Sequence, residues 1–223
     1  MILRRLYNWI RRFPHRCGYG VHSPSDFYLI TFVIYESLPY YKYKTLKAFR
    51  PLLYQYPHHR EKVDRFFLRF ANYLQLPSLL EVGTGSGLSA CYLSAGNEKM
   101  RCVTINPSLP EDVLAVLSSI HSIENKRGNE LKLLAQYLDK NKLDLVHIGY
   151  TPLYKEIWEM ILPHVEAYTC VLVSHPYADS MKKQWWKSVI ADSRVTVSFD
   201  LYDVGILFFN PKRCKEHRIV NFF

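Results

Sequence analysis

The sequence predicts an α/β protein: a mostly parallel, seven-stranded sheet with an antiparallel terminal hairpin, preceded by a helical N-terminal extension. From residue 78 onward, short apolar strands alternate with helices, which implies right-handed crossovers between parallel strands. The last two apolar segments are joined by only a few residues, and such a short turn can connect only antiparallel neighbours. A glycine-rich turn links the first strand to its helix and indicates a ligand site.

Length and composition indicate a folded chain with one large domain. The protein has 223 residues, of which 48% are hydrophobic and 22% charged. No apolar run approaches the ~18 residues that cross a bilayer, and no signal-type apolar core follows the first arginines. We therefore expect a cytoplasmic protein. The five cysteines show no paired spacing, so we expect buried free thiols: Cys17, Cys91, Cys102, Cys170 and Cys214.

The excess of positive over negative charge lies entirely in the first third of the chain. Residues 1–70 hold 13 Lys/Arg against 4 Asp/Glu, whereas residues 71–223 hold 16 of each. Either this part has a solvated basic surface, or it meets an anionic partner. We divide the chain at Gln75–Pro77 into a basic helical extension or lid, residues 1–76, and an α/β domain, residues 77–223.

The first segment has the pattern of an amphipathic cationic helix. Its apolar stripe and its arginines fall on different sides: Ile2, Leu6, Trp9 and Phe13 against Arg4, Arg5, Arg11 and Arg12. Such a helix can lie on an anionic membrane surface, here the inner face of the membrane, or can pack its stripe on the protein's own core. Nucleic acid is a less favoured partner. It would meet Lys42, Lys44, Lys47 and Arg50, which alternate with tyrosines, but no base-reading motif is present.

Three further helices are expected in the extension. Ser23 can cap a helix that begins at Pro24 and runs to Ser37. A short helix is expected near Thr45–Leu53. The clearest helical period follows, from Val63 to Leu74, and Pro77 ends it.

The α/β part is expected to contain five parallel strands and the hairpin. The strands are Ser78–Val82, Arg101–Ile105, Ser122–Asn125, Leu143–Ile148 and Thr169–Ser174, followed by Val195–Phe199 and Gly205–Phe209. The helices between them are Leu88–Ser94, Glu111–Ile120, Glu130–Asp139, Leu153–Ile161 and Ser180–Ala191.

The turn after the first strand reads Glu81-Val82-Gly83-Thr84-Gly85-Ser86-Gly87. Alternate glycines let the backbone turn tightly and approach a ligand, and the helix N-terminus adds a positive dipole end. A dinucleotide-binding loop would need a glycine where Leu88 stands. The spacing is therefore E-x-G-x-G-x-G.

This pattern resembles the cofactor loop of class I S-adenosylmethionine (SAM)-dependent methyltransferases. Two outer segments resemble an uncharacterised methyltransferase-like group from Bacteroidetes: the Gly20-Val21-His22-Ser23-Pro24 motif and the stretch from Asp200 to Phe209, with Trp186 before it. The resemblance implies the Rossmann-like SAM methyltransferase fold and SAM as cofactor. It places Glu81, Gly83, Thr84, Gly85 and Gly87 in cofactor binding, Asn106 at the ribose and Asn129 at the adenine.

The sequence departs from the methyltransferase pattern at the fourth and fifth strands. Metal-dependent relatives would carry acids where this chain has Gly149, Ser174 and His175, so we expect no metal site. Three residues are candidates for chemistry, each with a structural alternative. His175 can be a general base or a loop histidine, Tyr150 can stack on substrate or cover the sheet edge, and His22 can belong to a lid or flank a helix cap. His147, in mid-strand, is expected to be a hydrogen-bonded core residue.

Two functions remain open. The first is a SAM-dependent methyltransferase, metal-independent, acting on an unidentified acceptor that is a small molecule or lipid-like. The second is a catalytically degenerate protein of this fold that serves as a binding or interaction module. The missing acids favour the second and the intact glycine loop favours the first. The acceptor and the oligomeric state are not fixed by the sequence.

Overall fold

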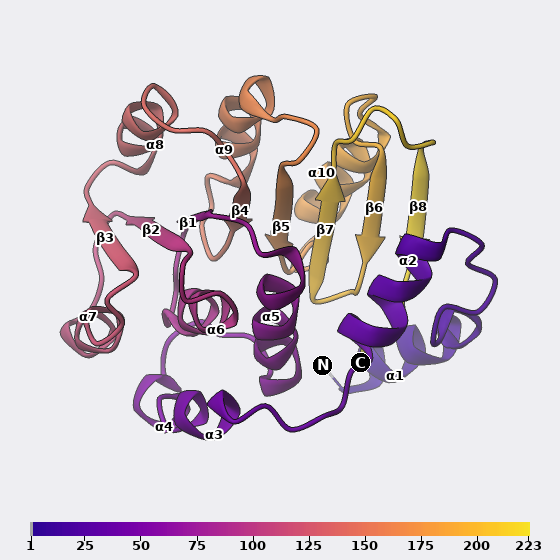
Figure 1. Cartoon of the computed structure of the whole chain (residues 1–223), viewed down its shortest axis with the longest axis horizontal. Coiled ribbons are helices and arrows are strands. Elements are labelled where there is room, and N and C mark those ends of the chain that lie inside the picture. The colour runs from indigo at the N-terminus through magenta and orange to yellow at the C-terminus, as the bar shows by residue number, and fades with distance from the viewer. Residues whose placement is uncertain (1) are drawn as a thin grey trace.

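The structure is a computed structural model that describes residues 2–223, with side chains described from Arg5 onward. Its centre is an eight-stranded sheet of order β3-β2-β1-β4-β5-β7-β6-β8 (Figure 1). The strands are β1 Ser78–Val82, β2 Arg101–Asn106, β3 Ile123–Arg127, β4 Leu145–Ile148, β5 Cys170–Ser174, β6 Val197–Asp200, β7 Val204–Phe208 and β8 Glu216–Ile219. Within this sheet, β7 alone runs antiparallel to its neighbours, as the predicted hairpin requires.

The predicted strand number of seven was wrong, because β8 extends the sheet beyond β6. It pairs in parallel with β6, from Val197 opposite Glu216 to Asp200 opposite Ile219. Its sequence, Glu-His-Arg-Ile, has no apolar alternation, so the sequence gives no strand signal. Ion pairs fix this strand instead. Asp26, 1% exposed, pairs with Arg218 in β8 and with Arg213 just before it.

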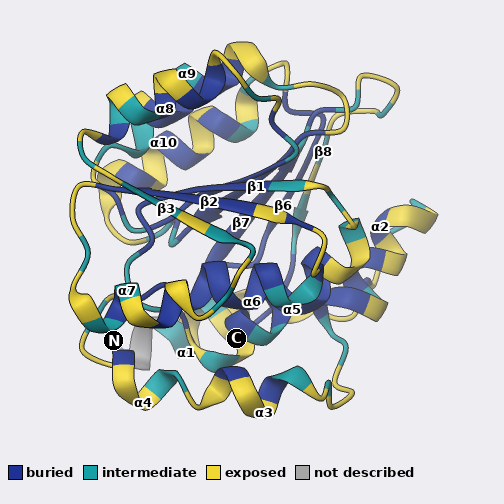
Figure 2. Ribbon diagram, turned by 60° about the vertical axis from the view of Figure 1, so that its left-hand side comes forward, coloured by how far each residue is buried: buried dark blue, intermediate teal, exposed yellow. Residues whose placement is uncertain are grey.

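Helices cover both faces of the sheet (Figure 2). One face carries α8 Glu130–Leu138, α9 Tyr154–Ile161 and α10 Ser180–Ala191. The other carries α5 Glu61–Leu74, α6 Leu88–Gly96 and α7 Glu111–Ser118. Each face has its own apolar core, since alternate residues of the buried strands point to opposite sides. Leu79 lies in the α5/α6 core, and its neighbour Leu80 lies in the α8–α10 core.

The extension before α5 is mostly helical but more broken than predicted. It comprises α1 Ile2–Arg11, a 3₁₀ turn Phe13–His15, α2 Pro24–Tyr28, a π-helical turn Leu29–Ile34, α3 Lys42–Lys47 and α4 Arg50–Leu53. The single helix predicted from Pro24 continues through the π turn and ends there. The helix predicted near Thr45–Leu53 is divided in two, with Pro51 in the first turn of α4.

The extension shares a core with the sheet. Helix α5 lies so close to α6 that a Cβ at Gly96 would be 2.2 Å from the Leu68 carbonyl oxygen. The division of the chain at Gln75–Pro77 stays a prediction. Of the cysteines, Cys91, Cys102 and Cys170 are buried, whereas Cys17 and Cys214 are exposed. No helix in the described part of the chain has both the length and the apolar content to cross a membrane.

Candidate functional site

The candidate site lies at the carboxyl ends of β1 and β4, where the strand order reverses. The chain runs outward from β1 to β2 and β3, then returns to place β4 on the other side of β1. In open α/β sheets this switch point forms a crevice for ligands. The glycine loop leaves β1 at this point, and Gly83, Gly85 and Gly87 have φ values of +80°, +62° and +79°. Glycine adopts these left-handed conformations without the strain of a side chain.

Glu81 is turned away from solvent and into the α5/α6 side of the sheet. It is fully buried, and its Oε2 accepts a hydrogen bond of 2.7 Å from Ser89 Oγ of α6. The same oxygen lies 2.6 Å from Nδ1 of His147, which stands opposite Glu81 in β4. His147 is thus the hydrogen-bonded core histidine that its mid-strand position predicted. Glu81 Oε1 has no partner among the described residues.

A hydrogen-bonded chain continues from His147 to the extension. His147 Nε2 is 2.8 Å from Ser174 Oγ at the end of β5, and Ser174 Oγ is 2.8 Å from Nε2 of His59. If His147 donates from Nδ1 to Glu81, its Nε2 accepts from Ser174, and Ser174 accepts from His59 Nε2–H. This arrangement leaves His59 Nδ1 as an acceptor, and that buried atom has no partner among the described residues. We call Glu81, His147, Ser174 and His59 the buried relay.

His59 is held neutral by its surroundings. It is 2% exposed, and burial lowers its pKa well below the usual value, with the charges of His175 and His147 acting in the same direction. Its ring stacks on His175 with centroids 4.4 Å apart, and Phe67 of α5 packs edge-on against it. Sequence reasoning missed His59, because the chain between α4 and α5 has no helical period; the adjacent His58-His59 pair was the one available signal.

Two of the candidate residues, His175 and Tyr150, lie side by side. Tyr150 OH and His175 Nε2 are 3.0 Å apart. His175 has φ +46°, and its backbone N–H donates to the Asp203 carbonyl at 2.8 Å. Burial lowers the pKa of His175 to about 4, although the charge of Asp203 opposes the shift. Burial likewise raises the pKa of Tyr150, so both side chains are neutral at pH 7.

The segment Gln55–His59, which we call the cover segment, crosses the glycine loop. Near its start, Tyr56 OH donates to the Asp112 carboxylate of α7 at 2.9 Å. In its middle, the Pro57 carbonyl accepts from Ser86 N–H at 2.9 Å. At its end, His59 is fixed by Ser174 and by two hydrogen bonds of 3.1 Å from the Arg50 guanidinium to its carbonyl.

The cover segment and Tyr150 fill the space directly over Gly85. A Cβ at Gly85 would lie 2.6 Å from the Pro57 carbonyl oxygen and 2.6 Å from Tyr150 Cδ2. Thr84 and Ser86 are buried. The loop therefore has the residue types and φ values of a cofactor cradle, but in this conformation its surface is in contact with the protein itself.

The two asparagines of the predicted site differ in environment. Asn106, 2% exposed at the end of β2, accepts from Thr84 N–H at 2.7 Å and donates to Thr84 Oγ1 at 2.9 Å, so it fixes the loop. Asn129 is exposed at the carboxyl end of β3 and caps α8 by accepting from Lys132 N–H at 2.9 Å. Next to it, Glu130 is buried and accepts from Thr151 Oγ1 at 3.3 Å, and burial raises its pKa.

His22 is not part of this site. It is exposed just before α2, and Ser23 and Asp26 of that region bind Arg213, close to β8. Of the two alternatives for His22, the structure agrees with a residue that flanks a helix cap: Ser23 caps α2, and α2 covers the β8 edge rather than the glycine loop. Sequence reasoning also missed Lys182 in α10, a side chain 7% exposed whose pKa is lowered to about 8 by burial. Its charge acts on both His59 and His175.

Asp203, in the turn between β6 and β7, joins the site to the N-terminus. Arg5 binds both of its carboxylate oxygens, at 3.0 and 2.8 Å, and Arg60 binds Oδ2 at 3.1 and 2.7 Å. Burial favours the protonated form of Asp203, but the bonds and charges of Arg5 and Arg60 outweigh it and lower the pKa of the carboxyl. Arg60 directly follows His59, so Asp203 ties down the end of the cover segment.

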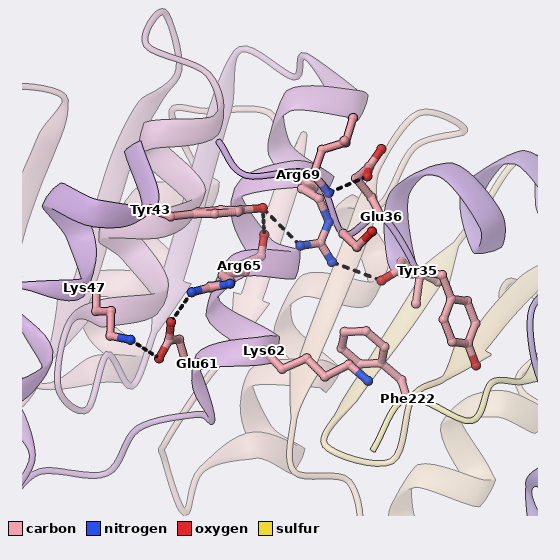
Figure 3. A pocket seen from close by; sticks show the side chains of 12 residues that line it. Tyr35, Glu36, Tyr43, Lys47, Glu61, Lys62, Arg65, Arg69 and Phe222 are labelled. Atoms are coloured by element: carbon pink, nitrogen blue, oxygen red, sulfur yellow. Dashed lines mark hydrogen bonds and ion pairs between the residues drawn. The ribbon is translucent and has the colours of Figure 1, made fainter. Parts of the chain in front are cut away.

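A cavity of about 550 Å³ lies in the extension, away from the glycine loop, and is shown in Figure 3. Three of its charged residues pair with one another: Glu61 binds Lys47 and Arg65. Arg69 donates to the Ile34 carbonyl and to Tyr43 OH, both at 3.0 Å. The cavity wall therefore braces α5 against α3 and the π turn.

Comparison with known proteins gives a fold likeness. No protein-family model matches the sequence, and no curated protein matches it. Solved structures do match. A putative caffeoyl-CoA O-methyltransferase from Staphylococcus aureus has a TM-score of 0.61 at 15% identity, covering 84% of this chain and 100% of that one.

Two ligand-bound structures are similar to the same extent. The SAH-bound methyltransferase PaMTH1 from Podospora anserina has a TM-score of 0.61 at 14% identity, covering 85% of this chain and 97% of that one. An O-methyltransferase from Bacillus cereus in complex with SAH has a TM-score of 0.59 at 15% identity, covering 77% and 92%. At these identities the likeness establishes a shared α/β methyltransferase-type fold.

Proposed function

We propose that the protein is a SAM-dependent methyltransferase that acts on a small-molecule or lipid-like acceptor without a metal ion. One observation carries the proposal: an E-x-G-x-G-x-G loop with three left-handed glycines stands at the switch point of the sheet. The fold shared with SAM- and SAH-bound O-methyltransferases supports it. When bound, SAM supplies an electrophilic methyl group, and the protein has to orient the acceptor and accept its proton.

The cofactor-binding residues in this proposal are those of the loop and the neighbouring strand ends. They are Glu81, Gly83, Thr84, Gly85, Gly87, Asn106 and Asn129. Asn106 acts by holding Thr84 in place, since both its side-chain oxygen and its side-chain nitrogen bond Thr84. Glu81 acts from beneath the loop, because both of its hydrogen-bonded neighbours, Ser89 and His147, lie in the core.

The buried relay offers a route for the acceptor's proton. His59 Nδ1 is the free basic atom, and a proton taken there makes His59 positive. His59 Nε2 can then pass its proton to Ser174 Oγ, while Ser174 passes its own to His147 Nε2. The charge ends on His147, 2.6 Å from the Glu81 carboxylate, which stabilises it. Tyr150 and His175 stay neutral beside this route and shape the acceptor side of the crevice.

The proposal is metal-free because of the chemistry of the strand ends. Gly149, Ser174 and His175 stand where paired acids would hold a hard cation, and Ser174 is already committed to two histidines. Within the described residues, no three His, Cys, Asp or Glu side chains are arranged to share a metal ion.

A second candidate function is a binding or interaction module with no methyl transfer. The observation that favours it is the closed crevice: the Ser86 amide is already bonded to Pro57, and Gly85 is covered by Tyr150. A protein that keeps this conformation permanently has no place for SAM.

Titration of the purified protein with SAM and S-adenosylhomocysteine, by calorimetry, separates the two functions. We expect binding with a Kd in the micromolar range, unchanged by EDTA. Gly85→Ala should weaken it at least tenfold, since a Cβ there fills space beside the loop that the cofactor needs and strains a backbone with φ +62°. Gly20→Ala is the matched control: its φ is +75°, and no atom lies within 4 Å of the added carbon. Absence of wild-type binding at millimolar ligand would refute the methyltransferase proposal and favour the module.

A further inference from the structure

Helix α1 is attached to the protein by its polar side. Arg5, Asn8 and Arg12 recur at helical spacing and face the body of the protein. Arg5 binds Asp203, and Asn8 Nδ2 lies 3.5 Å from Tyr202 OH. The attachment site is the turn between β6 and β7 (Figure 1).

The contact made by Arg12 is the most buried of these. Arg12 is 8% exposed; it donates to the Asp200 carbonyl at 3.0 Å and pairs with the Asp200 carboxylate at 2.9 Å. Its guanidinium also lies over the rings of Tyr177 and Tyr202. Two buried carboxylates thus receive Arg5 of α1 and Arg12, which directly follows the helix, and this fixes the rotation of α1 about its axis.

This rotation turns the apolar side of α1 to solvent. Leu6 is 52% exposed, Ile10 58% and Phe13 50%, and Tyr7 beside them is also exposed. The usual orientation of a surface helix, with apolar residues inward, is reversed. The expectation that the apolar stripe packs on the protein's own core was therefore wrong: the helix does pack on its own protein, but through arginines. The sequence also placed Ile2 on the apolar side and Arg4 on the cationic side, but their side chains are not among those that the structure describes.

Exposed arginines border the apolar side. Arg11 lies over the Tyr7 ring and Arg16 over the Phe13 ring, at 5.7 and 5.0 Å from the ring centroids, and both residues are exposed. Trp9 packs edge-on against Phe13 and is partly exposed. Apolar side chains flanked by arginines and a tryptophan match the layered chemistry of an anionic bilayer surface, where acyl chains lie beneath phosphate groups.

We propose that the outward side of α1 and of the 3₁₀ turn after it is a docking surface for an anionic lipid bilayer; it is formed by Leu6, Tyr7, Ile10, Arg11, Phe13 and Arg16. The helix has 10 residues, about 15 Å in length, so it lies in the interface and does not cross it. A second copy of the chain is a poorer occupant, because residues 1–16 contain no Asp or Glu that could pair with Arg11 and Arg16 of the other copy. The proposal does not depend on SAM binding.

Vesicle co-sedimentation of the full chain tests the proposal. The probe is large unilamellar vesicles of 30% phosphatidylglycerol in phosphatidylcholine, with pure phosphatidylcholine for comparison. We expect wild-type protein to pellet with anionic vesicles and at least tenfold less with neutral ones. The variant Leu6→Ser/Ile10→Ser/Phe13→Ser should lose at least tenfold in partitioning. It keeps Arg5 and Arg12, so α1 should stay attached, and circular dichroism checks this.

The matched control is Leu38→Ser/Met181→Ser, which removes two exposed apolar side chains that lie outside α1 and should pellet like wild type. A wavelength shift of Trp9 emission to the blue, obtained by subtracting the spectrum of Trp9→Phe, should accompany binding. Equal pelleting of wild type and triple variant, or no pelleting of wild type, overturns the proposal. Light scattering that shows a dimer lost in the triple variant overturns it too, because the surface is then covered by a second copy.

Discussion

At the scale of single residues, Ser174 joins two parts of the chain that no local pattern connects. Its hydroxyl bonds His59, 115 residues earlier, and His147 of the neighbouring strand. The sequence could place Glu81, His147 and Ser174 at strand positions, because apolar runs located β1, β4 and β5. It could not place His59, since that residue reaches the site only through the path of a loop.

The residue-scale prediction is that His59 takes up the proton that the methyl acceptor loses. It rests on the proposed methyltransferase activity. His59→Gln keeps an N–H donor for Ser174 but cannot take up a proton. We expect kcat to fall by about 10²–10⁴, the usual contribution of a general base, with the Kd of SAM changed less than about twofold. Steady-state kinetics across pH measures this, and the limb of the pH profile due to the base should disappear.

The control for this experiment is His58→Gln, the adjacent histidine, which bonds the Tyr56 carbonyl at 2.7 Å and has no contact with Ser174. It should retain activity. If His59→Gln were as active as His58→Gln, the relay would be a packing feature of the core, and the proton would have to leave by another route.

At the scale of elements, seven strands of the sheet were predictable, whereas β8 and the cover segment were not. Strand β1 and helix α10 begin and end at the predicted residues, because apolar runs and caps mark them. Strand β8 carries polar residues and owes its place to ion pairs with Asp26 of α2, which a local pattern cannot reveal. The cover segment is similar: its position depends on Asp112, Ser86 and Ser174, three partners from three distant elements.

The element-scale prediction is that loosening the cover segment tightens cofactor binding. Tyr56→Phe removes the hydroxyl that bonds Asp112 and leaves the ring in place. If the closed state competes with SAM, a loss of about 1 kcal/mol from that state should lower the apparent Kd about fivefold. Calorimetric titration measures the change.

Tyr54→Phe serves as its control, because Tyr54 is 73% exposed and its hydroxyl is not bonded to α7. A Tyr56→Phe protein that binds SAM with unchanged or weaker affinity would show that the cover segment does not compete, while leaving SAM binding itself intact.

At the scale of the whole molecule, stability should fall on the acid side of neutrality. His175 has a pKa of about 4 in the folded protein, against about 6.5 for an unfolded chain. Between these values the unfolded chain binds a proton that the folded protein does not, so the free energy of unfolding decreases as pH falls. The contribution of His175 is full above about pH 6.5, and His59 acts in the same direction.

Urea unfolding at pH 7.5 and pH 5.0 measures this dependence. His175→Asn, which tolerates the left-handed backbone at this position, should reduce the loss between the two pH values by up to about 2 kcal/mol. The difference between the two proteins reports His175 together with its effect on the pKa of His59, which His175 helps to lower. The same loss in both proteins would mean that His175 binds its proton equally well folded and unfolded.

The Asp203 carboxylate couples α1 to the cover segment. It is shared by Arg5 of α1 and by Arg60, which follows the cover segment. A change that takes Arg5 away leaves Arg60 as the only cation bonded to that carboxylate, and a change that moves Arg60 does the same to Arg5. The proposed docking of lipid on α1 and the proposed binding of SAM in the crevice would be linked through this carboxylate, and such linkage is reciprocal. By whatever factor lipid changes the affinity for SAM, SAM must change the affinity for lipid by the same factor.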